Sequence, residues 1–195
     1  MKRTFIILGV VLFLSACTSD VEKMAKNYEK HHEDISSLTR YMSEVLDDSC
    51  GLRMEISRKG KLSMFACHSK EERWLKWHDS DYQEYMPSIG LTQGELDSLI
   101  QFLQQSECIG IDIDPQQSEY FSVLYSRPGW LDGYSYLIFK EPISNEMWNS
   151  CLDDYCSIPY CDTIVFSYGA PAFGSDDIPK RDKMNFLKKH NIERR

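Results

Sequence analysis

Asp112 and Asp114 form the first candidate site in this 195-residue chain, because two carboxyl groups at this spacing could act together in binding or catalysis. They alternate with isoleucines over 109–114, and a β-strand places side chains two residues apart on the same face. Two carboxylates held side by side can bind calcium or act as general acid and base. The same alternation is typical of a half-buried strand whose isoleucines face the core and whose aspartates face solvent. We favour this second interpretation, and a chemical role of the two aspartates stays open.

A second candidate site is the loop Arg127–Gly133, which joins two predicted strands and carries Arg127, Trp130 and Asp132. Seven residues are more than a hairpin connection needs, and loops of this kind often carry function. Arginine and tryptophan are common anchors of interfaces, and an exposed indole can stack on a sugar, a peptide or a protein surface. Alternatively, Trp130 folds back over the edge of the sheet. We predict that Arg127, Trp130 and Asp132 bind a partner.

The sequence motifs of several enzyme classes are missing. The chain has no Gly-x-Ser-x-Gly, no phosphate-binding loop, no Gly-x-Gly-x-x-Gly and no His-Glu-x-x-His. All five histidines, at positions 31, 32, 68, 78 and 190, lie in predicted helices or at their edges. We therefore assign no catalytic residue and predict no cofactor, although members of a catalytic triad need not be neighbours in sequence.

The beginning of the chain has the pattern of an export signal. A basic start, Lys2-Arg3, precedes the apolar run Phe5–Leu14, and the small residues Ser15 and Ala16 then lead to Cys17. The run is too short to span a membrane, which takes about 20 apolar residues. Leu-Ser-Ala-Cys at 14–17 resembles the lipobox of bacterial lipoproteins. The alternative is an ordinary signal peptide, in which Cys17 has no such role.

The lipoprotein resemblance implies that Cys17 is the lipid attachment site. In that family the cysteine receives a diacylglycerol, its amine usually receives a further acyl chain such as palmitate, and the protein stays at the membrane because several chains are buried. Thr18 rather than aspartate follows Cys17, which in the family implies the outer membrane of bacteria with two membranes. Ser19, Asp20 and Glu22 resemble the acidic surface-export tags of some bacterial lipoproteins, so exposure on the cell surface is one possible location.

Six cysteines remain once Cys17 carries lipid, an even number in a compartment that permits oxidation. The disulfide candidates are Cys50, Cys67, Cys108, Cys151, Cys156 and Cys161. Segments 52–57 and 62–67 are predicted to form a hairpin around Lys59-Gly60. This arrangement makes Cys50 and Cys67 diagonal neighbours on one face and favours a bond between them. The cysteine spacings do not match those of zinc sites, and we predict no metal.

The net charge of −8 is distributed unevenly along the chain. Loss of Lys2 and Arg3 with the leader makes the net charge −10, and residues 180–195 carry seven basic and two acidic side chains, so the remaining body carries −15. An acidic body argues against nucleic acid as a partner. The basic C-terminal segment either complements the acidic body as a solvated helix or contacts anionic lipid headgroups. We favour the first interpretation.

Periodicity predicts helices and strands that could position these residues. Helices are expected over 21–45 with Asp20 as N-cap, over 69–86, from Thr92 with a capping box to Glu95, over 146–153 and in the basic C-terminal segment. Besides the hairpin, strands are expected over 109–114, 120–125, 134–139 and 163–168. The first helix has a spacing that also suits a coiled coil, but we expect it to lie on its own domain.

Short loops join most of the predicted strands, which favours antiparallel pairing. We predict an α+β fold with a mostly antiparallel sheet and helices packed on one face, preceded by a long N-terminal helix. The expected organisation is a signal peptide over 1–16, a lipidated tether and the start of the helix over 17–34, a single α+β domain over 35–179 and a basic C-terminal helix over 180–195.

Three functional hypotheses fit these observations. The first is a lipid-anchored envelope binding or interaction module without catalysis, such as an inhibitor, an immunity-like protein or an assembly subunit. Its partners would be the membrane, through the lipid on Cys17, and a protein of the envelope, not nucleic acid. The alternative is an envelope hydrolase that uses Asp112, Asp114 and Asp132 on glycan or peptide substrates. The third is a structural spacer built on the long N-terminal helix.

Overall fold

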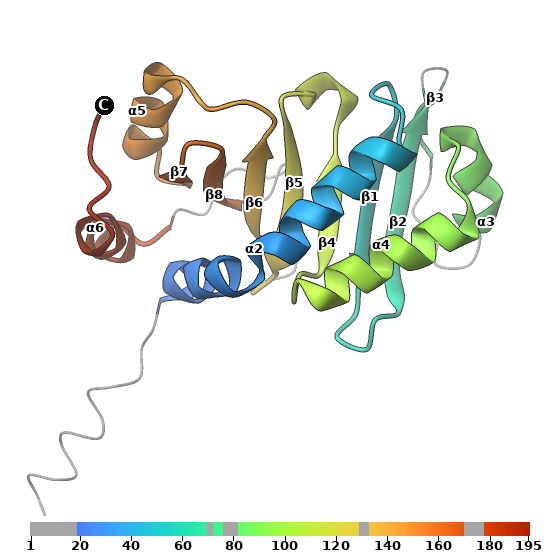
Figure 1. Ribbon diagram of the computed structural model, residues 1–195, viewed down its shortest axis with the longest axis horizontal. Helices are drawn as coiled ribbons and strands as arrows, with labels where there is room; N and C mark the ends of the chain where they lie inside the picture. Colours follow the sequence, from blue (N-terminus) through green and yellow to red (C-terminus); the bar gives the residue numbers. More distant parts are fainter. Residues whose placement is uncertain (1–18, 70–71, 76–81, 129–132, 170–177) are drawn as a thin grey trace, which may run out of the picture.

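The computed structural model describes residues 19–69, 72–75, 82–128, 133–169 and 178–195 (Figure 1). In these residues eight strands form one sheet in the order β3-β2-β1-β4-β5-β6-β8-β7, and all neighbouring strands are antiparallel. The predicted α+β fold is confirmed. The strands are β1 (Gly51–Ile56), β2 (Leu62–Ser69), β3 (Glu72–Leu75), β4 (Gly110–Ile113), β5 (Tyr120–Ser126), β6 (Gly133–Phe139), β7 (Ser157–Cys161) and β8 (Ile164–Gly169).

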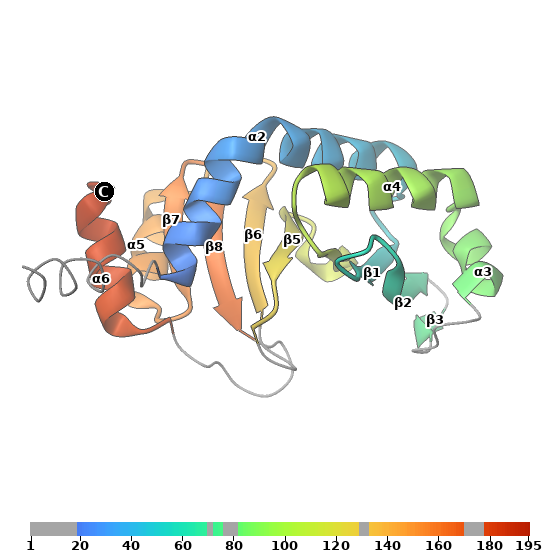
Figure 2. The same ribbon diagram turned by 90° about the horizontal axis from the view of Figure 1, so that it is seen from below.

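Two long helices, α2 (Asp20–Val45) and α4 (Gln93–Gln105), lie side by side across one face of the sheet (Figure 2). The long N-terminal helix is thus confirmed, and it packs on its own domain. Its N-cap is Ser19, whose side chain accepts a hydrogen bond from the backbone N–H of Glu22, and not Asp20 as expected. The helix is kinked at His31, where the backbone leaves the helical conformation.

The tether predicted over 17–34 is helical from Asp20 onward. Val21 and Met24 are fully buried in the same core as Leu38 and Met42, because the apolar stripe of α2 continues to its first turn. The start of the helix predicted within 17–34 is thus at Asp20, and residues 20–34 pack on the domain. The C-terminal helix α6 (Lys180–Lys189) also joins this core through Phe186.

Two predictions from local sequence signals are confirmed. Strands β1 and β2 form the expected hairpin, and Gly60 in its turn has a φ of 71°, a left-handed conformation that favours glycine. The capping box at the start of α4 is also present: the Thr92 side chain accepts from the backbone of Glu95, whose carboxylate accepts from the Thr92 backbone.

The helix predicted over 69–86 is wrong. The chain forms β3, which pairs with β2, and later a short helix α3 (Tyr82–Tyr85) and a 3-10 turn η1 (Met86–Ile89). An unpaired strand edge offers a row of backbone hydrogen bonds, and pairing with it outweighs the helical spacing of the aromatic residues. Trp77 lies outside the described residues.

The other end of the sheet holds a strand that the sequence analysis did not predict. Edge strand β7 contains Pro159, which is tolerated there because an edge strand does not need every backbone N–H. The expected helix α5 (Asn145–Asp153) follows its N-cap Ser144. It forms a small second core with Val165, whose side chain alternates along β8 with the main-core residues Ile164 and Phe166.

Candidate functional site: a polar hollow on the open face of the sheet

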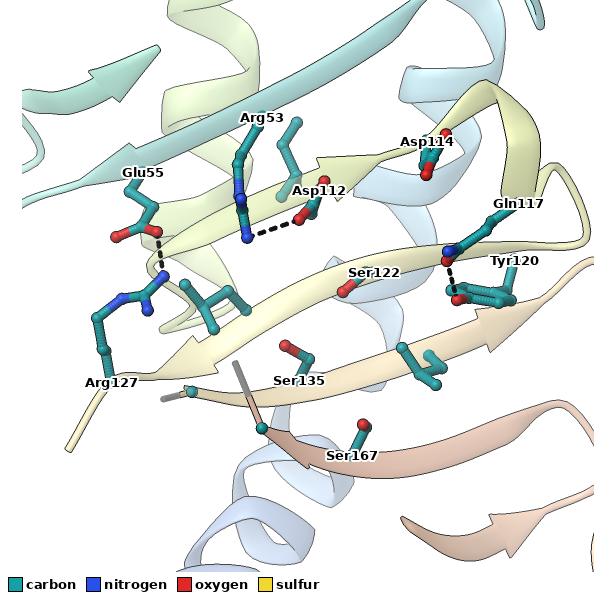
Figure 3. A pocket seen from close by; sticks show the side chains of 15 residues that line it. Arg53, Glu55, Asp112, Asp114, Gln117, Tyr120, Ser122, Arg127, Ser135 and Ser167 are labelled. Carbon is teal, nitrogen blue, oxygen red and sulfur yellow. Dashed lines mark hydrogen bonds and ion pairs between the residues drawn. The ribbon is translucent and has the colours of Figure 1, made fainter. Parts of the chain in front are cut away.

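The face of the sheet opposite α2 and α4 is hollowed over its middle strands (Figure 3). The hollow has a volume of about 410 Å³ and is lined from β1, β4, β5, β6 and β8. Strand alternation explains its polarity: main-core residues such as Met54 and Ile111 face the helices, so Arg53, Glu55 and Asp112 face the other way.

One side of the hollow carries two arginine–carboxylate pairs. Arg53 on β1 stands directly opposite Asp112 on β4, and its Nη2 lies 3.0 Å from the Asp112 Oδ2. Glu55, two residues further along β1, forms a short ion pair with Arg127, which follows the end of β5. Each of these four side chains is at most 28 % exposed. The pairs are therefore partly shielded from water, which strengthens them relative to surface salt bridges.

The opposite side of the hollow is formed by small residues. Ser122 stands opposite Asp112, and Ser135 stands opposite Ser167, so their hydroxyl groups form a band across β5, β6 and β8 (Figure 3). At Gly133 a Cβ atom would lie 2.5 Å from Leu124 Cδ1, closer than side chains pack. Short side chains at these positions leave the space that makes up the hollow.

Asp114, Gln117 and Tyr120 line one end of the hollow. Asp114 caps the 3-10 turn η2 (Pro115–Gln117) and accepts a 2.9 Å hydrogen bond from the backbone N–H of Gln116. The Tyr120 hydroxyl donates a short hydrogen bond to the Gln117 side chain. This end is therefore held by hydrogen bonds within the protein.

The electrostatics of the hollow centre on Asp112. Burial raises the pKa of this carboxyl group, and the charge of Arg53 opposes the rise, while Asp114 adds to it. Burial also raises the pKa of the Tyr120 hydroxyl, with a further contribution from Asp114. A carboxylate with its own arginine serves well as a fixed hydrogen-bond acceptor.

Of the predicted binding residues, Arg127 lines the hollow, whereas Trp130 and Asp132 lie outside the described residues. Asp112 and Asp114 both line it, on the same face as predicted. Arg53, Glu55 and the three serines were not singled out from the sequence. The alternation of polar Arg53 and Glu55 with apolar neighbours is the signal that would have indicated their shared face.

No disulfide bond joins the six cysteines other than Cys17, all of which lie in the part of the chain that the structure describes. Gly51 pairs with His68 and Leu52 with Cys67, so Cys50 and Cys67 are diagonal neighbours as predicted. Cys67 is buried with its Sγ 3.8 Å from the Tyr85 carbonyl oxygen, and burial raises the pKa of its thiol. The bond between Cys50 and Cys67 stays a prediction. Cys17 lies outside the described residues.

The other four cysteines lie apart from the hollow. Cys108 is buried after α4, and Cys151 is buried in α5. Cys156 directly precedes β7, and Cys161 is the last residue of that strand. Burial raises the pKa of the Cys108 thiol to about 12. In the part of the chain that the structure describes, no three histidine, cysteine or acidic side chains are grouped to hold a metal ion.

No family model, no curated protein and no solved structure matches this chain. Among the residues described, no helix is both long and apolar enough to cross a membrane.

Proposed function

We propose that this chain is a lipid-anchored binding module of the bacterial envelope that holds a partner in its polar hollow without catalysis. An inhibitor, an immunity-like protein and an assembly subunit all fit this description. The resemblance of residues 14–17 to a lipobox supports the anchor on Cys17. The pairing of Asp112 with Arg53 and of Glu55 with Arg127 is the observation that carries the binding role.

Paired carboxylates favour binding over catalysis for a physical reason. A general acid or base must exchange its proton with the substrate, and an adjacent guanidinium stabilises the ionised form of a carboxyl group. The same pairs offer a ligand fixed donors and fixed acceptors whose geometry is set before binding. The hollow thus resembles a preformed recognition surface.

The chemistry of the lining indicates the kind of ligand. Two guanidinium groups stand against three carboxylates, those of Glu55, Asp112 and Asp114, so the hollow has no large excess of either sign. The three serine hydroxyls can both donate and accept. These groups suit a polar ligand that offers donors and acceptors together, such as the hydroxyls of a glycan or the amides of an extended peptide.

An envelope hydrolase is the second candidate, and one observation favours it. Burial raises the pKa of Asp112, as in a carboxyl group that donates a proton during glycoside or peptide hydrolysis. In that case Asp112→Asn should abolish turnover of an envelope glycan or peptide. Under the binding proposal the wild-type protein turns over neither substrate.

The binding test compares two serine substitutions. Ser135→Leu fills the hollow, whereas Ser36→Leu places the same side chain on the exposed surface of α2. Each anchored protein is purified from its own envelope, and the species that co-purify are identified and titrated against the purified protein. We expect Ser135→Leu to weaken binding at least tenfold and Ser36→Leu to bind as the wild type. Equal binding by both variants, with equal stability, would contradict the proposed site.

The anchor has its own test. The wild-type protein should incorporate labelled palmitate and partition into detergent, and Cys17→Ala should do neither. Labelling that persists in Cys17→Ala would overturn the lipid attachment.

A further inference from the structure

One end of the molecule is formed by α6 and the first turns of α2 (Figures 1 and 2). We call it the basic end, because seven basic side chains lie there: the buried Lys183 and the exposed Lys23, Lys26, Lys180, Arg181, Lys188 and Lys189. Three acidic residues, Asp20, Glu22 and Asp182, accompany them, so the basic end carries a net charge of +4. A polar hollow of about 470 Å³ between the two helices is lined by Lys26, Arg181 and Lys189 among others.

This charge is separated from the rest of the protein. Without Lys2 and Arg3 the chain carries −10, which leaves −14 outside the basic end. Part of the basic C-terminal segment does complement the acidic body: Arg194 pairs with Asp153 and Arg195 with Asp162. Lys189 pairs with Glu22 inside the basic end. In contrast, Lys26, Lys180 and Lys188 form no salt bridge among the described residues, so their charge is directed at solvent.

The outer face of α6 combines charge with one apolar side chain. Phe186 and Lys183 are buried, which fixes the rotation of the helix on the domain. Arg181, Met184 and Lys188 then fall on the opposite, exposed stripe at helical spacing, and Met184 is 58 % exposed. Basic residues around an exposed apolar side chain are typical of helices that lie at a membrane interface.

We propose that the basic end rests on the anionic headgroups of the membrane in which the lipid anchor sits. This proposal rests on the proposed lipid on Cys17. Ser19, the N-cap of α2, is two residues after Cys17, and two residues span at most about 7 Å. The anchor therefore holds the first turn of α2, and α6 beside it, close to the headgroup layer.

Physical principles make this orientation favourable. Each basic side chain near an anionic membrane strengthens binding about fivefold, and the N-terminus of α2 adds the positive end of a helix dipole. The acidic remainder of the protein is repelled by the same surface. Figure 2 shows β3 and α3 at the opposite end of the molecule, so they would project away from the membrane.

The test measures lysine acetylation by mass spectrometry on the full lipidated protein in two kinds of vesicle. One vesicle contains phosphatidylcholine alone, and the other contains 30 % phosphatidylglycerol. We expect acetylation of Lys26, Lys180 and Lys188 to slow at least fivefold on the anionic vesicles and to recover in 1 M salt, which screens charge beyond about 3 Å. Lys59 and Lys61, exposed at the turn of the β1–β2 hairpin, should react equally on both.

Matched variants separate this proposal from the anchor. Lys180→Gln/Arg181→Gln/Lys188→Gln should abolish the protection of Lys26 without changing palmitate incorporation, and Lys59→Gln/Lys61→Gln should change neither. Absence of palmitate on the wild-type protein would refute the anchor. An anchored protein whose Lys180 and Lys188 react equally on both vesicles, or whose Lys59 is protected instead, would overturn the orientation proposed here.

Discussion

Replacing Lys183 with methionine should destabilise the domain far more than the same change at Lys188 on the same helix. The Lys183 side chain is only 6 % exposed. Its Nζ donates hydrogen bonds to the carbonyl oxygens of Cys151 at 2.9 Å and Ser157 at 2.7 Å, and also to that of Asp154. These carbonyls belong to the end of α5 and the start of β7. A single ammonium group therefore attaches α6 to this corner of the domain.

The magnitude follows from the contacts that would be lost. A hydrogen bond to a charged group contributes about 1.5–3 kcal/mol, and a buried acceptor left unpaired costs about 1–3 kcal/mol. Methionine keeps most of the aliphatic stem, so packing changes little. Burial lowers the pKa of Lys183, which means that removing the charge recovers part of its desolvation penalty. We expect a net loss of about 3 kcal/mol in the free energy of unfolding, or about 6–12 °C in Tm for a chain of this size.

Urea and thermal unfolding of Lys183→Met and Lys188→Met would test this prediction. Both variants lose one positive charge from α6, and the exposed Lys188 should change stability by less than about 0.5 kcal/mol. If Lys183→Met loses no more stability than Lys188→Met, the three carbonyls do not depend on the ammonium group and the reasoning is refuted.

Three further predictions address the thiols, the tyrosines and the loop after β5. In protein isolated from the proposed oxidising compartment, peptide mapping without reductant should find Cys50 bonded to Cys67, with a contribution of about 3 kcal/mol to stability, and free thiols at both positions would contradict this. Burial raises the pKa of Tyr28 and Tyr134 to about 12, whereas both ionise near pH 10 in the unfolded chain. The contribution of each tyrosine to the free energy of unfolding is thus complete below pH 10 and decreases by about 1.4 kcal/mol per pH unit towards pH 12. Stability to urea that is unchanged over this pH range would contradict this prediction. Trp130→Ala should weaken partner binding by about 2 kcal/mol with little change in Tm, whereas a fall of several degrees without a binding defect would indicate a core residue.

The elements that were predicted correctly depend on signals that act within a few residues. Thr92 and Glu95 cap α4 through contacts inside one helical turn, and Gly60 allows the tight turn of the β1–β2 hairpin. The helix expected over 69–86 failed because its competitor is not local. The edge of β2 decides that this segment starts as a strand, and the existence of that edge depends on the whole sheet.

In the candidate site, too, local signals were predicted correctly and contacts between distant segments were not. The alternation around Asp112 predicted its face, and the loop composition indicated Arg127. Neither signal predicted that Asp112 would pair with Arg53. That contact exists only because β1 and β4 are neighbours in the sheet, although β2, β3, α3 and α4 separate them in the sequence. Sequence reasoning from one chain can assign a residue to a face, but it cannot assign its cross-strand partner without the order of the strands.

The composition of β6 and β8 gives a further argument that the hollow has a role beyond solubility. On the core side these strands pair Tyr134 with Tyr168 and Tyr136 with Phe166, residues that favour strands strongly. On the open side they pair Ser135 with Ser167 and Gly133 with Gly169, which favour strands weakly. Local geometry accounts for the two glycines, because a Cβ at Gly133 would lie 2.5 Å from Leu124 Cδ1 and Gly169 has a φ of 154°. Ser135 and Ser167 are different: at these positions a face that only had to meet water could carry threonine, which favours strands. The strands instead carry serine where short side chains leave room for a ligand, and this supports the binding proposal.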